Sequence, residues 1–431
     1  MRAIFEQDNP AFLSTTALEL LNARFSGRCM LPSLRQIWWF RSLPERHLVL
    51  ILPLIISPIL TKFELRLGVS TSLQVIIIAI ESLAPAYGSL QDVYIYAAPR
   101  DHQMIEPVST LLLKCNKLRN FHVDSPLSWT AFLHAAQLPN LERIIIRADT
   151  TAPPGTSLPT TMFPSVKSLD IKGVNMDSAW VQSLARIRPK SLRMLTLGFQ
   201  SAVAGALLPE VFANLQVSGS HRTLSYLKIT PNGHFNLNGT IIDLLTSLNQ
   251  LAVLDISSTC DSDWCGYLLT DADIERLVKA APKLGSLLLG GSSCTRPAGH
   301  TMKSLIAIAK HCKHLDHLTI HTNVEAIIAR VFDLDGWREK PASEDPLRDF
   351  VDCPLRSITF NPCPIPREQQ GETVFALTLL RLFPRLSGVE VFQMADEPDP
   401  QWELVQNFVT VYRRIRANIA ETGEYVGLYH I

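Results

Sequence analysis

Histidine and cysteine side chains, which are residue types that bind zinc, gather in one stretch of the chain, KHCKHLDHLTIH. The candidate ligands are His311, Cys312, His314, His317 and His321. This stretch is expected to contain a helix end, a turn and a strand, so only His317 and His321 would share a face. We therefore expect no metal site here.

A second candidate is the sequence CDSDWC, in which Cys260, Asp261, Asp263 and Cys265 could bind a cation. A polar turn explains the same residues without a ligand. The chain contains no phosphate-binding loop, nucleophile elbow, HExxH pair or dinucleotide fingerprint. We therefore expect no catalytic residues and no cofactor, and we expect that the protein is not an enzyme.

Composition limits the compartment and the partners. The eight cysteines are scattered over 431 residues, which predicts reduced thiols in the cytoplasm or nucleus. The first residues, MRAIFEQDNPAFLSTT, lack the apolar run of a secretory signal. The most apolar run, at 48–60, contains two prolines and is shorter than the roughly 20 residues of a membrane-spanning helix, so we expect a buried helix there and no membrane partner. Lys plus Arg and Asp plus Glu both number 40, and this balance argues against a nucleic-acid partner.

A short apolar pattern, L-x-x-L-x-L, recurs thirteen times along the chain. The mean step between units is about 29 residues, which is typical of strand–helix repeats. Several units begin with a proline that is expected to follow a helix end, as in LPSL, LPNL and FPSV. The middle apolar positions are residues 37, 63, 93, 121, 144, 169, 195, 227, 254, 287, 318, 358 and 389.

Between these strands the apolar period changes from 2 to about 3.6, which predicts helices. They are expected at 74–83, 105–115, 179–187, 241–248, 274–281, 302–311 and 374–382, with Asp177 and Asp271 as N-caps. Residues 148–162 contain three prolines and are predicted to form a loop in place of a helix. Residues 333–352 are predicted to be a polar insertion.

The repeats predict an α/β fold, a right-handed leucine-rich-repeat solenoid (horseshoe) of about 13 rungs, with a parallel β-sheet on the concave face and helices on the convex face. The solenoid is expected to span residues 31–393. Residues 1–30 are interpreted as a short helical segment and a candidate remnant of an N-terminal domain, without a strand to cover the first rung. Residues 394–431 are predicted to form a capping helix, at 402–420, and a tail.

The segments LPSLRQIWWF, LPNLERIII, FPSVKSLDI, CKHLDHLTI and FPRLSGVEVF resemble the diverged leucine-rich repeats of fungal F-box proteins, in particular those of mushrooms. The resemblance implies a substrate-recognition component of a cullin-type ubiquitin ligase. The F-box is not found, because Leu43-Pro44-Glu45 follows the first repeat strand and is interpreted as the start of an ordinary repeat helix. The ligase adaptor is therefore expected as a partner only if an F-box exists upstream. A free-standing scaffold protein is the alternative, and an enzyme with a site in its inserted loops is a remote one.

The side chains that flank the buried strand positions should point onto the concave face, because strand residues alternate between the two faces. The first six rungs are richest there in aromatic and arginine side chains, the types enriched in binding hot spots. We expect a protein substrate to bind there, and charge reversal of Arg66 and Arg147 to abolish its capture. The alternative is that these are solvated strand residues. The predicted contact residues are Trp38, Arg66, Tyr94, Tyr96, His122, Asp124, Arg147 and Lys172.

Overall fold

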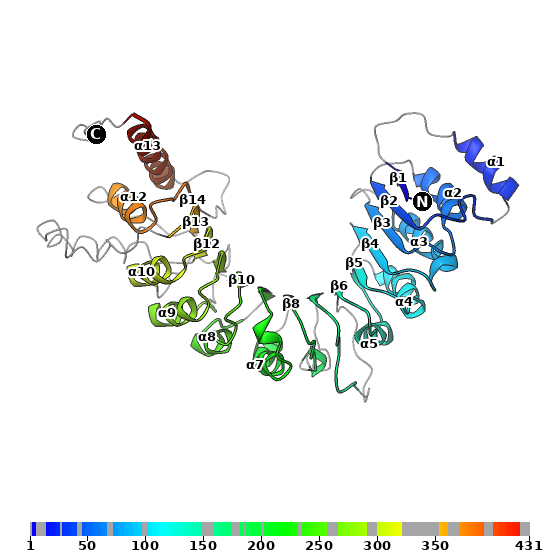
Figure 1. The fold of residues 1–431 in the computed structure, drawn as a ribbon, viewed down its shortest axis with the longest axis horizontal. Coiled ribbons are helices and arrows are strands. Elements are labelled where there is room, and N and C mark those ends of the chain that lie inside the picture. Colours follow the sequence, from blue (N-terminus) through cyan, green and yellow to red (C-terminus); the bar gives the residue numbers. More distant parts are fainter. Residues whose placement is uncertain are drawn as a thin grey trace, which may run out of the picture. The chain divides into compact units, whose positions relative to one another are not determined.

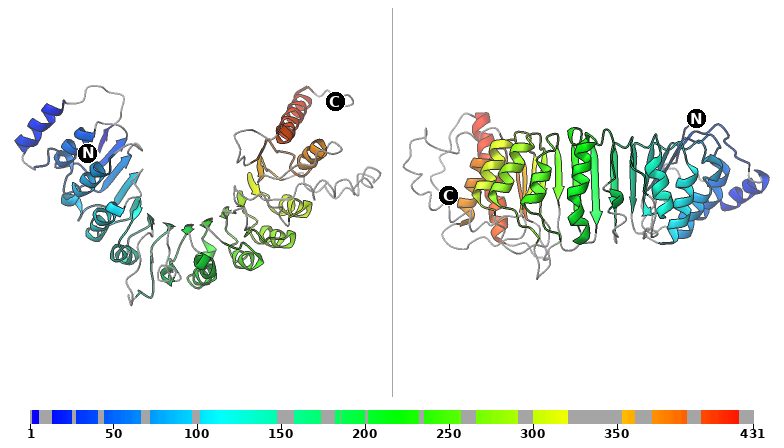
Figure 2. Two further views of the ribbon diagram at one scale, coloured as in Figure 1. Left: turned by 180° about the vertical axis from the view of Figure 1, so that it is seen from behind. Right: turned by 90° about the horizontal axis from the view of Figure 1, so that it is seen from below.

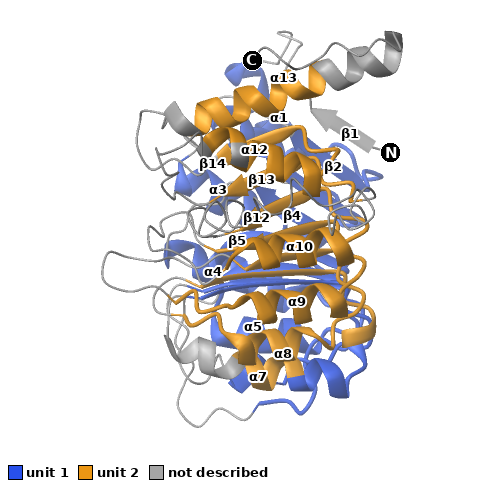
Figure 3. Ribbon diagram, turned by 90° about the vertical axis from the view of Figure 1, so that its left-hand side faces the viewer, with its two compact units in different colours: residues 1–200, 213–220 blue, residues 201–212, 221–431 orange. Residues whose placement is uncertain are grey.

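The structure of the chain is a computed structural model. It describes residues 2–5, 14–25, 28–40, 45–66, 72–96, 102–147, 158–173, 182–184, 186–199, 202–231, 235–256, 266–290, 300–320, 353–360, 371–391 and 400–422. The chain divides into two compact units (Figure 3). Unit 1 comprises residues 1–200 and 213–220, and unit 2 comprises residues 201–212 and 221–431.

The strands confirm the predicted α/β repeat solenoid. Fourteen strands are found in the described part of the chain, and their order in the sheet follows their order in sequence. Within each unit, neighbouring strands pair in parallel. Unit 1 contains β1 (Arg2–Phe5), β2 (Gln36–Phe40), β3 (Lys62–Arg66), β4 (Asp92–Tyr96), β5 (Asn120–Pro126), β6 (Arg143–Arg147), β7 (Ser168–Lys172) and β8 (Met194–Phe199). Unit 2 contains β9 (Tyr226–Pro231), β10 (Val253–Ile256), β11 (Ser286–Leu289), β12 (His317–Ile320), β13 (Ser357–Phe360) and β14 (Gly388–Val391).

The helices of each unit lie along one face of its strands (Figures 1 and 2). We call the opposite face the open face. Helices occur in most of the predicted intervals, and α5 and α7 are additional to the prediction. The described helices are α1 (Thr15–Phe25), α2 (Glu45–Ile55), α3 (Leu73–Glu81), α4 (Ile105–Lys114), α5 (Trp129–Gln137), α7 (Ala202–Val217), α8 (Gly239–Leu245), α9 (Asp271–Ala280), α10 (Met302–His311), α12 (Gly371–Leu382) and α13 (Pro400–Thr422).

The three apolar positions of each repeat form the core. Of the thirty-nine side chains at these positions, thirty-eight are described and all of these are buried. The largest include Trp39, Phe63, Phe121 and Phe360. The apolar run at 48–60 is largely α2, with Leu48, Leu52 and Leu54 buried, as predicted. Among the described residues, no helix is long and apolar enough to cross a membrane.

A second regularity lies in the backbone just before each strand. The carbonyl of Arg35 accepts hydrogen bonds from two consecutive amides of the next repeat, Thr61 N at 2.8 Å and Lys62 N at 3.1 Å. The same doubled acceptor recurs in both units and holds the strands that follow in register through backbone hydrogen bonds. At two of these carbonyls a hydroxyl adds a third bond, from Thr61 Oγ1 to Arg35 O at 2.9 Å and from Ser387 Oγ to Arg356 O at 2.8 Å. The other acceptors are the carbonyls of Thr61, Gln91, Arg119, Glu142, Lys167, Ser225, Ala252, Gly285, Asp316 and Arg356.

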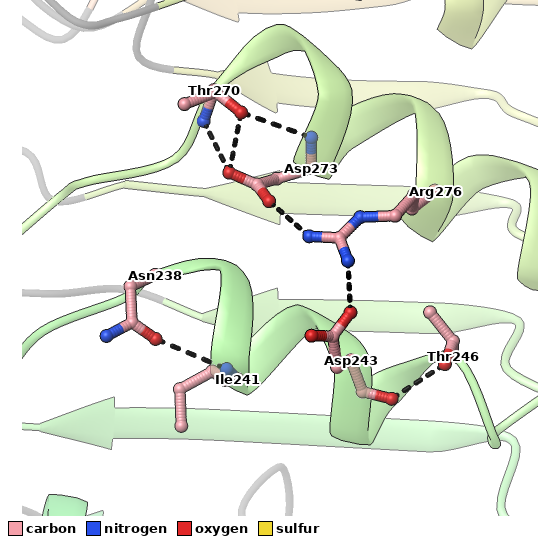
Figure 4. A network of polar contacts seen from close by, with 7 residues as sticks. All are labelled: Asn238, Ile241, Asp243, Thr246, Thr270, Asp273 and Arg276. Atoms are coloured by element: carbon pink, nitrogen blue, oxygen red, sulfur yellow. Dashed lines mark hydrogen bonds and ion pairs between the residues drawn. The ribbon is translucent and has the colours of Figure 1, made fainter.

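Helix ends in unit 2 are connected by polar side chains (Figure 4). Thr270 and Asp273 form a capping box at the start of α9. Arg276 then bonds Asp273 at 2.5 Å and also pairs with Asp243 of α8, which links neighbouring repeats. Gly239 leaves room for this arrangement, because a Cβ there would lie 2.8 Å from an Asp273 carboxylate oxygen.

The prediction that Asp271 is an N-cap is wrong. The N-cap of α9 is Thr270, and Asp271 is the first helical residue. Its carboxylate reaches the next repeat and accepts four hydrogen bonds, from the backbone amides and hydroxyls of Thr301 and Ser304 at the start of α10. Asp177, the other predicted N-cap, lies outside the described residues.

The N-terminal segment differs from the prediction. Helix α1 is present, and Asn22 donates a hydrogen bond to the Leu50 carbonyl of α2 at 2.6 Å. However, β1 pairs in parallel with β2, so the edge of the first predicted rung is covered. Helix α2 begins at Glu45 and lies between β2 and β3, the position of an ordinary repeat helix.

A helix occurs at the position predicted for the capping helix: α13 packs against α12 and β14. Its Trp402, Val405 and Val409 side chains are buried, and Gln406 accepts a hydrogen bond from the Val389 amide of β14 at 2.6 Å. In the loop predicted at 148–162, only residues 158–162 are described and they contain no helix; Met162 forms an isolated bridge with Ile187. The predicted insertion at 333–352 lies outside the described residues.

Candidate functional site

The open face of unit 1 presents the predicted contact residues in rows that cross the strands. Trp38, Glu64, Tyr94 and His122 are register partners from β2 to β5. Arg66 and Tyr96 are partners in the next row. Because parallel strands lie about 4.8 Å apart, side chains in such rows are close enough to contact one another.

Four rings and Arg66 from these rows, with Lys62 from the neighbouring row, form a continuous group, which we call the aromatic strip. Its rings belong to Trp38, Tyr94, Tyr96 and His122, all half-buried. The two tyrosine rings are stacked with centroids 6.3 Å apart, and the His122 ring meets Tyr96 edge-on at 4.6 Å. Its cations, Lys62 and Arg66, lie over these rings. The side chains of the aromatic strip therefore pack against one another in the absence of a bound partner.

The cations of the aromatic strip are held in place by the rings and by the buried carboxylate of Glu64. Lys62 Nζ lies 5.2 Å from the Trp38 ring centroid and 5.1 Å from that of Tyr94. The Arg66 guanidinium lies 4.8 Å from the Tyr96 centroid. Glu64, which is buried, pairs with Lys62 at 3.4 Å and with Arg66 at 2.9 Å. Each cation thus has both an aromatic face and a carboxylate to fix its position.

The predicted residues Asp124, Arg147 and Lys172 lie together beside the aromatic strip, with Asp170. Asp124 lies 3.8 Å from Arg147 Nη1 and 3.5 Å from Lys172 Nζ, and Lys172 lies 3.9 Å from Asp170. We call these four residues the charged cluster. It joins β5, β6 and β7 through ion pairs.

Arg147 corrects the prediction, because it is only 6% exposed and cannot serve as a contact residue on the surface. Next to it, β5 is irregular between His122 and Pro126, after which Arg147 pairs with Pro126. In regular pairing Arg147 would be opposite Asp124. Charge reversal of Arg147 would therefore break a buried ion pair and test folding rather than binding.

The neutral form of His122 is favoured at this site. Burial lowers the pKa of His122, and the nearby Lys172 ammonium lowers it further. A ring without charge can pack edge-on against Tyr96 at little cost in desolvation. Burial also raises the pKa of Tyr94, with a contribution from Asp92, so both groups are expected to be neutral near pH 7.

We predict that the imidazole of His122 titrates below the ordinary value of about 6.5. Since the folded pKa is the lower one, protonation opposes folding, and stability falls as the pH drops from the unfolded pKa to the folded pKa. Imidazole NMR signals, assigned with His122→Gln, would give the midpoint. Lys172→Met should move the midpoint upward. A wild-type midpoint at or above the ordinary value would contradict the prediction.

Among the described strands of unit 2, the open face carries fewer rings, those of Tyr226 on β9 and His317 on β12. Lys228 and the buried Asp255 form an ion pair at 2.5 Å. Later strands present Leu288, Thr319 and Thr359, all half-buried. The concentration of large rings is thus a property of unit 1, in the rungs that the sequence indicated.

The histidine and cysteine residues of KHCKHLDHLTIH do not assemble a metal site in the described part of the chain. His311 is half-buried at the end of α10, Cys312 is buried, and His314 and His317 are exposed. Burial raises the pKa of the Cys115 and Cys312 thiols to about 12, so neither is an ionised nucleophile near neutral pH. No group of three histidine, cysteine or acidic residues among those described could hold a metal ion. His321 and the CDSDWC sequence lie outside the described residues.

Comparison with protein-family models and with curated proteins gives no match for this chain. The chemistry of the open face is therefore the feature that indicates a function. Lys62 flanks the second apolar position, Phe63, but it was not among the predicted contact residues. The two-residue period from Lys62 through Glu64 to Arg66 would have placed it on the same face.

Proposed function

We propose that the chain is a protein-binding module and that the aromatic strip of unit 1 holds the protein partner. The observation that carries this proposal is the set of half-exposed rings with Lys62 and Arg66 fixed over them. Tryptophan, tyrosine and arginine dominate the binding energy of protein interfaces. Side chains already ordered on strands lose little conformational entropy on binding, which favours affinity.

The proposed biological setting is substrate recognition for a cullin-type ubiquitin ligase, in the cytoplasm or nucleus. It is supported by the resemblance of the repeats to those of fungal F-box proteins. The ligase adaptor is a proposed partner only if an F-box is encoded upstream. Translation of the upstream genomic sequence and co-purification with the adaptor both test this setting. If both fail, a free-standing scaffold is the better proposal.

Arg66→Glu is expected to reduce partner capture at least about tenfold, because it places a second carboxylate beside Glu64 and removes the cation from Tyr96. The full-length chain would be immobilised and exposed to lysate of the native cell, and bound proteins would be quantified by mass spectrometry. Arg356→Glu is the matched control. Arg356 is an exposed arginine of unit 2 that lies 3.3 Å from Asp316.

A true partner should bind the wild type and Arg356→Glu alike, and should be lost from Arg66→Glu. Circular dichroism of all three proteins would verify folding. Equal recovery of every bound protein by Arg66→Glu would refute the role of the aromatic strip.

A further inference from the structure

Unit 1 has a second surface, at the edge of the sheet where its strands begin. A depression of about 640 Å³ lies there, beside the starts of β4 to β8. Four cationic side chains line it, those of Lys117, Arg119, Lys167 and Lys190, with Glu142 as the single acidic one. We call it the basic depression. It lies on a different part of the strands from the aromatic strip.

The acid in the basic depression is already paired. Glu142 accepts hydrogen bonds from Lys167 at 2.7 Å and from Arg119 at 2.9 Å, and these bonds lower the pKa of its carboxyl. Among the described residues, Lys117 and Lys190 form no ion pair. The basic depression therefore has three positive charges in excess, and two of its ammonium groups are available to an anion.

The charge of the whole chain conceals this local excess. Unit 1 contains 20 basic and 14 acidic residues, whereas unit 2 contains 20 basic and 26 acidic residues. The net charge of zero is thus the sum of +6 and −6. Whole-chain neutrality does not exclude an anionic ligand on unit 1.

The spacing of the available lysines indicates the size of that ligand. Lys117 precedes β5 and Lys190 precedes β8, so their repeats are three strand spacings, or about 14 Å, apart. A single phosphate group is too small to reach both. An extended peptide covers that distance with about four residues.

The lining also distinguishes between polyanions. Beside the charged groups it consists of proline, asparagine, serine and glutamine residues, and none of the described residues that line it is aromatic. Proteins that bind single-stranded nucleic acid stack its bases on aromatic rings. We propose that the basic depression binds an extended acidic peptide segment of a protein partner. This inference rests on the proposed function only in assuming that the ligand belongs to a protein.

The test uses a fluorescein-labelled peptide of about eight alternating glutamate and serine residues, titrated by anisotropy at low salt. The double variant Lys117→Glu/Lys190→Glu should weaken its binding at least about tenfold. The matched control is Lys283→Glu/Lys313→Glu. These two exposed lysines of unit 2 occupy the same positions before β11 and β12.

Weakening in the first variant but not in the control supports the proposal. Absence of binding to the wild type, or equal weakening in both variants, would overturn it. Tighter binding of a labelled oligonucleotide that displaces the peptide would overturn it in favour of nucleic acid.

The test is independent of the aromatic strip. Arg66→Glu should leave binding of the acidic peptide unchanged. If the peptide binds as expected but the aromatic strip captures nothing, the proposed function fails and the acidic-peptide site stands. If capture depends on Arg66 but the peptide does not bind, only the present inference fails.

Discussion

Phe121→Ala should lower the free energy of unfolding of unit 1 by about 3–5 kcal/mol. Phe121 is fully buried at the middle apolar position of β5. Its register partners, Val93 on β4 and Ile144 on β6, are also fully buried. Neighbours on both sides are fixed by the backbone ladder and cannot move far to fill the space, so the cavity remains and the cost is high.

The loss is best measured by hydrogen exchange of the β4, β5 and β6 amides, because repeat proteins open locally as well as globally. The matched control is Met194→Ala on the open face of β8, where the side chain is 38% exposed and the expected loss is below about 1 kcal/mol. A loss for Phe121→Ala no greater than that of the control would show that the repeat core is not packed as described.

Asp271→Ala should destabilise the packing of α9 on α10 by about 2–4 kcal/mol. The carboxylate accepts from the amides of Thr301 at 2.8 Å and Ser304 at 3.1 Å, and from both hydroxyls at 2.7 and 2.5 Å. Alanine leaves two amides at the start of α10 without this acceptor. Urea unfolding followed by circular dichroism would measure the loss.

Two variants make this measurement specific. Asp271→Asn retains one acceptor oxygen and should cost less than Asp271→Ala. Asp243→Ala removes a carboxylate that is mostly exposed, and should cost little. If Asp271→Ala and Asp243→Ala cost the same, the contact between repeats contributes no stability.

The carboxylate of Asp271 should also make the free energy of unfolding depend on pH in the acidic range. Burial acts to raise the pKa of Asp271, but hydrogen bonds from Ser304 and Thr301 outweigh it, and the folded pKa is lowered. Its contribution is therefore complete above the unfolded value of about 4 and is lost as the pH falls through the folded pKa. Asp271→Asn should remove that part of the acid dependence.

The strands were predictable because the buried positions of each repeat can be recognised within that repeat alone. In Leu118, Phe121 and Val123, as in the other units, the alternation of buried and exposed positions is visible in one short segment. Strand β1 was not, because it lacks the leucine or valine that lies two residues before each of the other described strands. Helix α5 has nine residues, and its clearest signal was the single N-cap Ser128.

The candidate site was predictable only in outline. Alternation along β3 and β4 correctly placed Arg66, Tyr94 and Tyr96 on one face. It did not reveal that Arg147 is buried on that face, because burial depends on the neighbouring strands, one of which is irregular after His122. The basic depression was also not predictable, because it joins residues just before five different strands and the net charge of the whole chain is zero.

The doubled backbone acceptors bear on how a chain of this kind can evolve. Each joins one repeat to the next through peptide groups, so eleven junctions in the described part of the chain offer the same two backbone hydrogen bonds whatever the side chains are. Removal or duplication of one complete repeat would bring equivalent peptide groups together at the new junction. Removal of half a repeat would bring a strand edge against a helix. Recombination that exchanges whole repeats is thus the route by which such a gene can lengthen or shorten and still encode a folded protein, while the open-face side chains diverge.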